Sequence, residues 1–452
     1  MRYRPGALVA LLTAVAVTLS GFTAIATAGN VHAHASAVTL TVLEHQQLRI
    51  DALKKTIIPQ FEAAEKKAGK DVHVKLVEEV LPDDQFASKL TLQYSQGKGP
   101  DVTSFVASSV PDYAAAGYLL DLSSRVNAWP DWKKHFYPVV RQLTAQGGGK
   151  IYSLPRGATT LQLFYRKDVL QKLGISTAQP TSWSSLIARL TQIEAKTGKP
   201  SVVYPSGTQW GGGSFDEGFM HVFLGTGGKL YDPASKKWIV KSAALTKAFG
   251  FYASLQQAKL LPDDALLSPQ PWQPTKYVDF VKGTLPVTTS GSWAWQYDWG
   301  PGGGAPIKNL RNVVATWQFP TANGGTPFVT ANLDWAWAIA KSTKNPDVAW
   351  DWVKFLNTGT ALAEDITAAG SLAPRDDIRG VAPYSAHAVL VKSEKQLRSA
   401  KVFKPAPGIA KIQEAVGKAT EEILTGKADG PKAAADFTSL ASKLLGKGSV
   451  QG

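Results

Sequence analysis

Two tryptophans separated by one residue, Trp293 and Trp295, are the first side chains whose type and spacing suggest a chemistry. They follow a Ser-Gly turn signal, and eight of the chain's 14 tryptophans lie between Trp293 and Trp352. In an extended segment alternate side chains point to the same side, so both indoles would share one face. A flat indole face can stack on the apolar face of a sugar ring. We expect most of these tryptophans to be core residues and a few to form a carbohydrate platform.

The sequence lacks the motifs of several common enzyme classes. It has no cysteine, no Gly-x-Ser-x-Gly, no His-Glu-x-x-His and no Walker loop, and its seven histidines show no paired spacing. Adjacent acids occur at 83–84, 263–264 and 376–377, all in turns beside Pro or Gly, whereas a glycosidase holds two carboxylates across the scissile bond. We therefore predict a binding protein with no enzymatic activity, cofactor or metal. A secreted carbohydrate-active enzyme is the alternative from another class.

The first part of the chain must form the elements that position a ligand site. Alternating apolar residues predict strands, and helical spacing predicts helices, in the order strand 38–43, helix 50–69, strand 72–76, helix 83–97 and strand 101–106. Helical crossovers between neighbouring strands imply a parallel sheet with helices on its faces. Ligands bind beyond the carboxyl ends of such strands. This rule makes Glu44, His45 and Ser108 candidate ligand-binding residues.

Later segments supply the remaining local signals. A strand over residues 285–289 leads into the tryptophan pair, and a helix capped by Ser182 runs to about Thr197. Trp210 precedes three glycines, where we expect an exposed aromatic side chain. The bend at residues 155–157 predicts a first crossing between domains at about residues 156–160.

The first 35 residues differ from the rest of the chain. A short basic start, an apolar run over residues 7–20 and small residues up to Ala35 are typical of a cleaved signal peptide. Without cysteine there is neither a disulfide nor a lipoprotein anchor, so we expect a periplasmic or secreted protein. The net charge of +14 is spread along the chain with no dense run, so we predict no nucleic-acid partner.

Several short blocks between residues 38 and 445 occur in a fixed order. They lie at residues 99–102, 115–122, 151–155, 163–168, 173–175, 180–183, 279–283, 290–294, 341–346, 349–352 and 370–375. In this order they resemble the sugar-binding, maltose-binding-protein-like family of extracellular solute-binding proteins that serve ABC importers. Arg166 and residues 285–287 depart from the family pattern at structural positions.

The resemblance implies a two-lobe α/β periplasmic-binding-protein fold of type II, with the ligand cleft between lobes joined by hinge crossings. The first lobe would combine residues 38–156 with 331–365. The second lobe would combine residues 157–330 with 366–452. Closure about the hinge would bury the ligand.

The resemblance also points to individual site residues. Trp293 matches a tryptophan that stacks on sugar in this family, and Asp101 matches an aspartate near the floor of the cleft. Asn332 and Asp334 stand where a Gly-Gly pair is common, and Arg375 could bond the ligand or pair with a neighbouring acid. The full set of candidate ligand-binding residues is Trp293, Trp295, Trp210, Asp101, Glu44, His45, Ser108, Asn332, Asp334 and Arg375.

The function implied is that of the substrate-binding component of an ABC importer. Such a protein captures a mono- or oligosaccharide and delivers it to the transmembrane subunits of a permease. We expect it to be a monomer. A polyamine, a peptide or a glycerophosphodiester is the alternative ligand within the same class: many acids around the aromatic residues would favour a cation, and clustered arginines would favour a phosphate.

Overall fold

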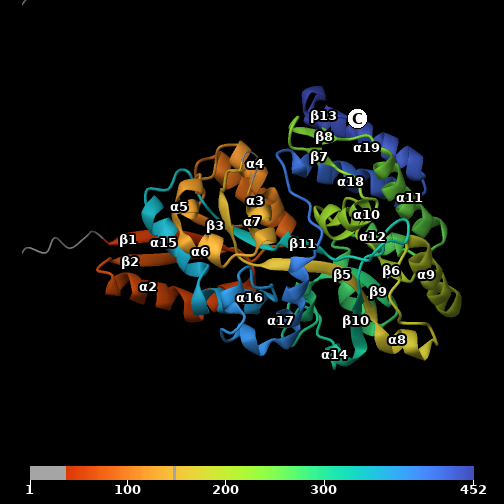
Figure 1. Cartoon of the computed structure of the whole chain (residues 1–452), viewed down its shortest axis with the longest axis horizontal. Helices are drawn as coiled ribbons and strands as arrows, with labels where there is room; N and C mark the ends of the chain where they lie inside the picture. Colours follow the sequence, from red (N-terminus) through yellow and green to blue (C-terminus); the bar gives the residue numbers. More distant parts are fainter. Residues whose placement is uncertain (1–36, 146–148) are drawn as a thin grey trace, which may run out of the picture. The chain divides into compact units, whose positions relative to one another are not determined.

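The computed structural model describes residues 37–145 and 149–452, so the expected signal peptide at 1–35 lies outside the described residues. Residues 37–452 form one compact unit built from three β-sheets and the helices that cover them (Figure 1). None of the helices in these two ranges is both long and apolar enough to cross a membrane.

The first sheet has five strands in the order β2–β1–β3–β12–β4. Their bounds are β1 (Val38–Glu44), β2 (Val72–Glu78), β3 (Val102–Val106), β4 (Ser153–Pro155) and β12 (Trp335–Ile339). Strand β1 is parallel to β2 and β3, as the helical crossovers predict, whereas β12 is antiparallel to both of its neighbours. The β-α-β-α-β order expected from the sequence is therefore confirmed at the start of the chain.

The second sheet has the strand order β10–β5–β9–β6, with β11 also paired to β5. Its strands are β5 (Ala158–Arg166), β6 (Val202–Val203), β9 (Val287–Gly291), β10 (Val314–Trp317) and β11 (Thr330–Leu333). A small third sheet joins β7 (Tyr231–Asp232), β8 (Lys237–Ile239) and β13 (Val450–Gln451). Every residue of β5 is buried, because strands pair with it on both sides and helices cover the sheet.

Three segments connect the first two sheets. Strand β4 continues into β5, and β11 continues into β12, with a single bend in each. The backbone N–H of Asp334 donates to the carbonyl of Gly157 over 3.2 Å, so these two bends lie side by side. The third segment passes Lys401, whose backbone hydrogen-bonds Val329 and Ala331 beside β11. These neighbouring crossings form the connection about which two lobes can move.

Ten α-helices are associated with the first sheet and its flanks. They are α1 (Gln47–Ala52), α2 (Ile58–Lys67), α3 (Asp83–Ser95), α4 (Val110–Ala115), α5 (Ser123–Ala128), α6 (Pro130–Lys134), α7 (Pro138–Thr144), α15 (Pro346–Leu356), α16 (Gly359–Ala369) and α17 (Ala388–Glu394). Between α1 and α2 a π-helical turn, η1 (Leu53–Ile57), keeps the chain helical up to Pro59, which lies in the first turn of α2.

The other α-helices surround the second and third sheets. They are α8 (Lys167–Lys172), α9 (Trp183–Thr197), α10 (Met220–Gly225), α11 (Ala243–Gln257), α12 (Asp263–Leu266), α13 (Phe280–Lys282), α14 (Leu310–Val313), α18 (Ile409–Leu424) and α19 (Gly430–Leu445). Helix α9 begins where the sequence predicts, because Ser182 and Ser185 form a capping box, and it ends at Gly198 with φ of 66°.

Short π- and 3₁₀-helical turns complete the fold. The π-helical turns after η1 are η4 (Ser214–Phe219) and η5 (Gln273–Asp279). Among the described residues the 3₁₀ turns include η2 (Ala107–Ser109), η6 (Ser292–Trp295), η7 (Asp376–Ile378), η8 (Tyr384–Ala386), η9 (Lys395–Arg398) and η10 (Lys447–Ser449). Turn η6 replaces the extended conformation considered for the tryptophan pair.

The two larger sheets have separate hydrophobic cores. Residues 366–397 differ from the lobe assignment made from sequence, because Ile378, Leu390 and Leu397 pack in the core of the first sheet. After α16 the chain turns back at Leu372, which pairs with Ala158, and it stays against the first core until the third crossing. We therefore propose that the first lobe also contains residues 366–398.

Candidate functional site

The lobes touch through the segment that follows β3. Turn η2 and helix α4 of the first lobe contact helix α18, and the hydroxyl of Ser108 donates to Asp216 Oδ2 of η4 over 3.2 Å. The same oxygen accepts a hydrogen bond of 3.1 Å from the amide of Gln413 in α18. Ser108 therefore lies where the sequence places a ligand contact, at the carboxyl end of β3 and facing the other lobe.

Behind this contact lies a group of charged and aromatic side chains of the second lobe, here named the acidic–aromatic cluster. Its members are Trp210, Asp216, Glu217, Lys276, Tyr277, Trp293 and Asp298. Asp216 and Glu217 lie in π-helical turn η4, and Lys276 and Tyr277 lie in η5. π-Helical turns are rare and are often found at functional sites.

Lys276 is the cation of the cluster. Its side chain is only 4% exposed, and its ammonium forms an ion pair with the carboxylate of Glu217. The ammonium also lies 5.3 Å from the ring centroid of Trp210, within the range of a cation–π interaction. Trp210 in turn packs edge-on against Trp272, with ring centroids 6.3 Å apart.

Asp298 is the most deeply buried carboxylate of the cluster. It is 4% exposed, and it accepts a hydrogen bond of 3.0 Å from the Tyr277 hydroxyl and another from the indole of Trp293. The hydrogen bond to Asp298 holds the N–H edge of the Trp293 indole. The rest of that ring is half-buried and packs against the second core.

Two glycines make room for the indoles. A Cβ atom on Gly291 would come within 1.8 Å of the Trp293 ring, and one on Gly213 within 2.3 Å of the Trp210 ring. Such distances are far below van der Waals contact, so each ring covers a position that only glycine can occupy without movement. The local sequences Gly291-Ser292-Trp293 and Trp210-Gly211-Gly212-Gly213 thus set the ring positions.

Burial changes the ionisation of two carboxylates in the cluster. Burial raises the pKa of Asp216 to about 7, although the Ser108 hydrogen bond acts in the opposite direction. Burial likewise raises the pKa of Asp298 to about 6, and the charge of Lys276 only partly offsets this effect. Both groups can therefore change charge near neutral pH.

A second polar group lies at the crossing from β4 to β5. The guanidinium of Arg156 is fully buried and bonds both Glu44 and Asp365, and its Nη1 donates to Ser104 over 2.8 Å. Its charge also lies 4.0 Å from the ring centroid of Trp337. Burial is the largest influence and opposes ionisation of Glu44, but the charge of Arg156, together with His45 and the charge of Arg49, outweighs it and holds the Glu44 pKa well below its usual range.

The second crossing is tied to the same group. Arg49 is fully buried and bonds Asp334, Asp365 and Ser371, and Ser371 also donates to Asp334. Charged hydrogen bonds therefore hold helix α1, both bends and the end of α16 together. Both carboxylate oxygens of Glu44 and the Oδ2 atom of Asp334 therefore already have protein partners.

The three tryptophans that the sequence predicts to bind ligand do not all lie together in the structure. Trp293 and Trp210 both belong to the acidic–aromatic cluster. Trp210 is 6% exposed, so the exposed loop position expected for it is wrong, because its ring packs against Trp272 and Lys276. Trp295 points elsewhere, since a 3₁₀ turn rotates residues two apart to different sides, and its ring packs on Phe164 at 5.4 Å.

His45 and Asn332 lie outside the cluster. The imidazole of His45 is 2% exposed, stacks on Phe86 with ring centroids 4.0 Å apart, and also packs on Trp335. Asn332 is half-buried in β11, where its backbone pairs with Thr159 next to the crossings.

Asp101 and Arg375 are held by other parts of the first lobe. Asp101 precedes β3, at the strand end opposite to Ser108, and its carboxylate accepts from Thr41 and from the Thr343 hydroxyl. Arg375 is 2% exposed and pairs with Asp377 and Asp131, so of its two expected roles the structure shows pairing with a neighbouring acid.

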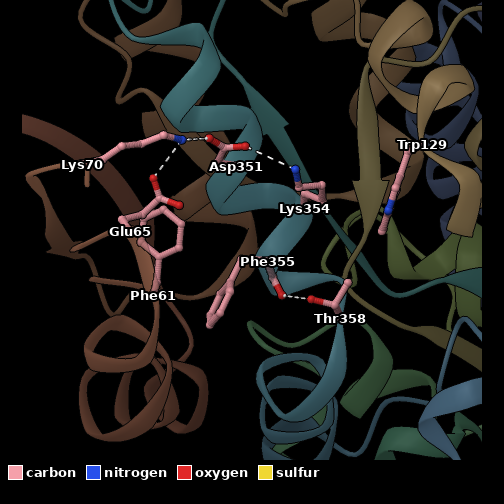
Figure 2. Close-up of a pocket in the computed structure, with 8 residues that line it drawn as sticks. All are labelled: Phe61, Glu65, Lys70, Trp129, Asp351, Lys354, Phe355 and Thr358. Atoms are coloured by element: carbon pink, nitrogen blue, oxygen red, sulfur yellow. Dashed lines mark hydrogen bonds and ion pairs between the residues drawn. The ribbon is translucent and has the colours of Figure 1, made fainter. Parts of the chain in front are cut away.

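A cavity of about 430 Å³ lies on the first lobe (Figure 2), and none of the residues that line it belongs to the acidic–aromatic cluster. The rings of Phe61, Phe355 and Trp129 line it. Its charged side chains are engaged with one another, since Lys70 bridges Glu65 and Asp351 (Figure 2). The cavity therefore offers few polar groups that could bind a ligand.

Sequence reasoning missed five residues of the cluster. Asp216, Glu217, Lys276, Tyr277 and Asp298 come from three separate stretches of chain, and none belongs to a block shared with the family. Four of them lie in π-helical turns, which alternation, helical spacing and capping residues do not predict. A cue was available for Asp298, which directly precedes Trp299 and the Gly-Pro loop behind the tryptophan pair.

Comparison with known proteins adds independent findings. A family model described as bacterial extracellular solute-binding protein matches residues 57–390. A protein of Deinococcus radiodurans named "Probable ABC transporter-binding protein" is 26% identical over 299 residues, which are 64% of this chain and 66% of that protein. The multiple sugar-binding protein of Streptococcus mutans is 23% identical over 335 residues, which are 72% of this chain and 73% of that protein.

The fold also resembles solved structures. The GacH receptor of Streptomyces glaucescens, whose structures include a complex with acarbose, aligns with a TM-score of 0.72 and 21% identity. The alignment covers 90% of this chain and 98% of that receptor. The two-lobe fold expected from the sequence is thereby confirmed.

Proposed function

Because this chain belongs to the family of bacterial extracellular solute-binding proteins, we propose that it captures a carbohydrate between its two lobes and delivers it to the permease of an ABC importer. The proposal covers capture without chemical conversion of the ligand. It places the protein outside the cytoplasm as a monomer that meets the transmembrane subunits of the permease.

The acidic–aromatic cluster is the observation that supports a sugar most directly. Indole and phenol rings suit the apolar face of a pyranose. Ionised carboxylates and a lysine ammonium form strong hydrogen bonds with hydroxyl groups. Trp293 and Trp210 bring the first kind of group, and Asp216, Glu217 and Lys276 bring the second, at the place where Ser108 of the other lobe arrives. The relatives named above include proteins whose names or complexes refer to sugars.

Titration with saccharides tests the proposal. Intrinsic tryptophan fluorescence and isothermal titration calorimetry would be recorded with a panel of neutral mono- and oligosaccharides, and each mixture would be analysed for new reducing ends. We expect saturable binding with no new product. Release of reducing sugar from an oligosaccharide would contradict capture without conversion, and the absence of binding to every saccharide would contradict the ligand class.

A cationic solute such as a polyamine is the second candidate, because the cluster has more acids than bases. Glu217 is paired with Lys276, and within residues 37–145 and 149–452 no Lys, Arg or His forms an ion pair with Asp216 or Asp298. Spermidine belongs in the same titration panel for this reason. Tight binding of spermidine with no response to saccharides would favour this candidate over the first.

A further inference from the structure

Helix α18 begins without a capping side chain of its own. The residue that precedes it, Gly408, has φ of +88° and no side chain that could accept a hydrogen bond. The first N–H groups of a helix need acceptors from elsewhere. Here the carboxylate of Asp112 supplies them, accepting from the N–H of Gly408 over 2.6 Å and from the N–H of Ala410 over 3.2 Å.

This cap crosses from one lobe to the other. Asp112 lies in α4, directly after β3 of the first sheet, whereas Ile412 and Val416 of α18 pack in the second core. The contact of Ser108 with Asp216 and Gln413 joins the same parts of the two lobes. Both hydrogen bonds of Asp112 can form only while the lobes are together, because their donors and acceptor belong to different lobes.

We propose that Asp112 is a latch: a helix cap supplied by the first lobe that favours the closed arrangement and thereby strengthens ligand binding without contacting the ligand. This inference rests on the proposed capture of a ligand between the lobes. In the open arrangement the carboxylate and the α18 N–H groups return to water. The latch therefore lowers the free energy of the closed arrangement relative to the open one. Because the ligand is bound in the closed arrangement, this difference strengthens the apparent ligand affinity.

The chain offers a matched control in the next helix. Helices α18 and α19 each have 16 residues, and the carboxylate of Asp429 caps α19 by accepting from the N–H of Lys432 over 2.9 Å. Both residues of that cap belong to the second lobe. Asp429→Ala therefore removes the same kind of hydrogen bond and leaves the contact between the lobes intact.

The first measurement follows closure directly. The chain has no cysteine, so Ser95→Cys in α3 and Lys427→Cys after α18 allow spin labels on exposed sites of the two lobes. Double electron–electron resonance then gives the distance distribution with and without saccharide. We expect Asp112→Ala to increase the long-distance population, Asp112→Asn to restore much of the short distance because asparagine also caps helices, and Asp429→Ala to match the parent.

The second measurement is affinity for a saccharide that the parent binds. We expect Asp112→Ala to weaken it by about 2- to 30-fold, the range that corresponds to loss of one helix cap. Asp429→Ala should leave it unchanged. Asp112→Lys, which places a positive charge at the positive end of α18, should weaken binding further, and Asp112→Asn serves as the second variant if Asp112→Ala does not fold.

Identical distance distributions for Asp112→Ala and the parent would overturn the latch. An equal loss of affinity in Asp112→Ala and Asp429→Ala would overturn it too, because the effect would then be one of helix stability. If the parent binds no saccharide, the proposed ligand class fails, while the distance distributions still decide the latch.

Discussion

Trp293 and Trp295 are close in sequence, yet their indoles have different surroundings. The Trp293 ring is hydrogen-bonded to Asp298 within the acidic–aromatic cluster, and the Trp295 ring packs on Phe164. Trp293→Ala should weaken saccharide binding by about 10- to 100-fold, because an aromatic platform and its buried area are lost. Trp295→Ala should change affinity by less than about threefold. Calorimetric titration of both variants measures this difference.

Each variant needs a check of folding. Both indoles are half-buried, so we expect each substitution to lower the free energy of unfolding by about 1–3 kcal/mol, as judged by urea denaturation. Similar stability losses with unequal affinity losses would assign Trp293 to the ligand site. An unchanged affinity in Trp293→Ala would remove Trp293 from that site.

At the scale of elements, the passage from β4 to β5 depends on Arg156. Replacing it by methionine leaves the buried carboxylates of Glu44 and Asp365 without their main cation. Loss of one partner from a buried ion pair typically costs about 3–5 kcal/mol, and we expect Arg156→Met to lower the free energy of unfolding by that amount. Urea denaturation of the variant and the parent at pH 7 measures it.

An exposed ion pair provides the control for this experiment. Lys432 is exposed and Asp436 is partly exposed, so Lys432→Met should leave the free energy of unfolding close to that of the parent. If Arg156→Met also remained within about 1 kcal/mol of the parent, the buried group would have no stabilising role at the crossing.

Local elements could be predicted from sequence, whereas the site could not be assembled from it. The strand at 38–43 and the helix capped by Ser182 are found within one or two residues of their expected bounds, because alternation and capping are local signals. The ring position of Trp295 was not predictable, since a 3₁₀ turn and an extended segment differ only in backbone angles. Asp216 and Lys276 meet through packing between distant segments, and no local pattern encodes that contact.

The pH dependence of binding belongs to the whole molecule, because Asp216 of the second lobe is contacted by Ser108 of the first lobe, beside Gln413 and Glu217 of its own lobe. Burial raises the Asp216 pKa to about 7 in this structure, in which Ser108 of the first lobe contacts it. An exposed aspartate titrates near 4, so closure takes up a proton between about pH 4 and pH 7. Affinity for a neutral saccharide should therefore increase as the pH falls from 8 to 6.

Calorimetry in buffers of different ionisation enthalpy measures this proton uptake, and Asp216→Asn should abolish it. Glu217, Lys276 and Asp298 face the same region, and the groups that set the raised pKa of Asp298, about 6, all lie in the second lobe, so closure leaves it unchanged. A cationic ligand reverses the sign, because it binds the ionised carboxylates. Affinity that falls with falling pH would thus contradict a neutral ligand.

The position of β12 between β3 and β4 has a consequence for synthesis of the protein. Strand β3 ends at Val106 and β12 begins at Trp335, about 230 residues later. At ribosomal rates of about 5–20 residues per second, the first sheet waits about 10–50 s for this strand. Meanwhile β3 lacks a partner on one edge and β4 has no partner in the sheet, and such edges invite aggregation. The first sheet therefore keeps these open edges until the segment that contains β12 joins it.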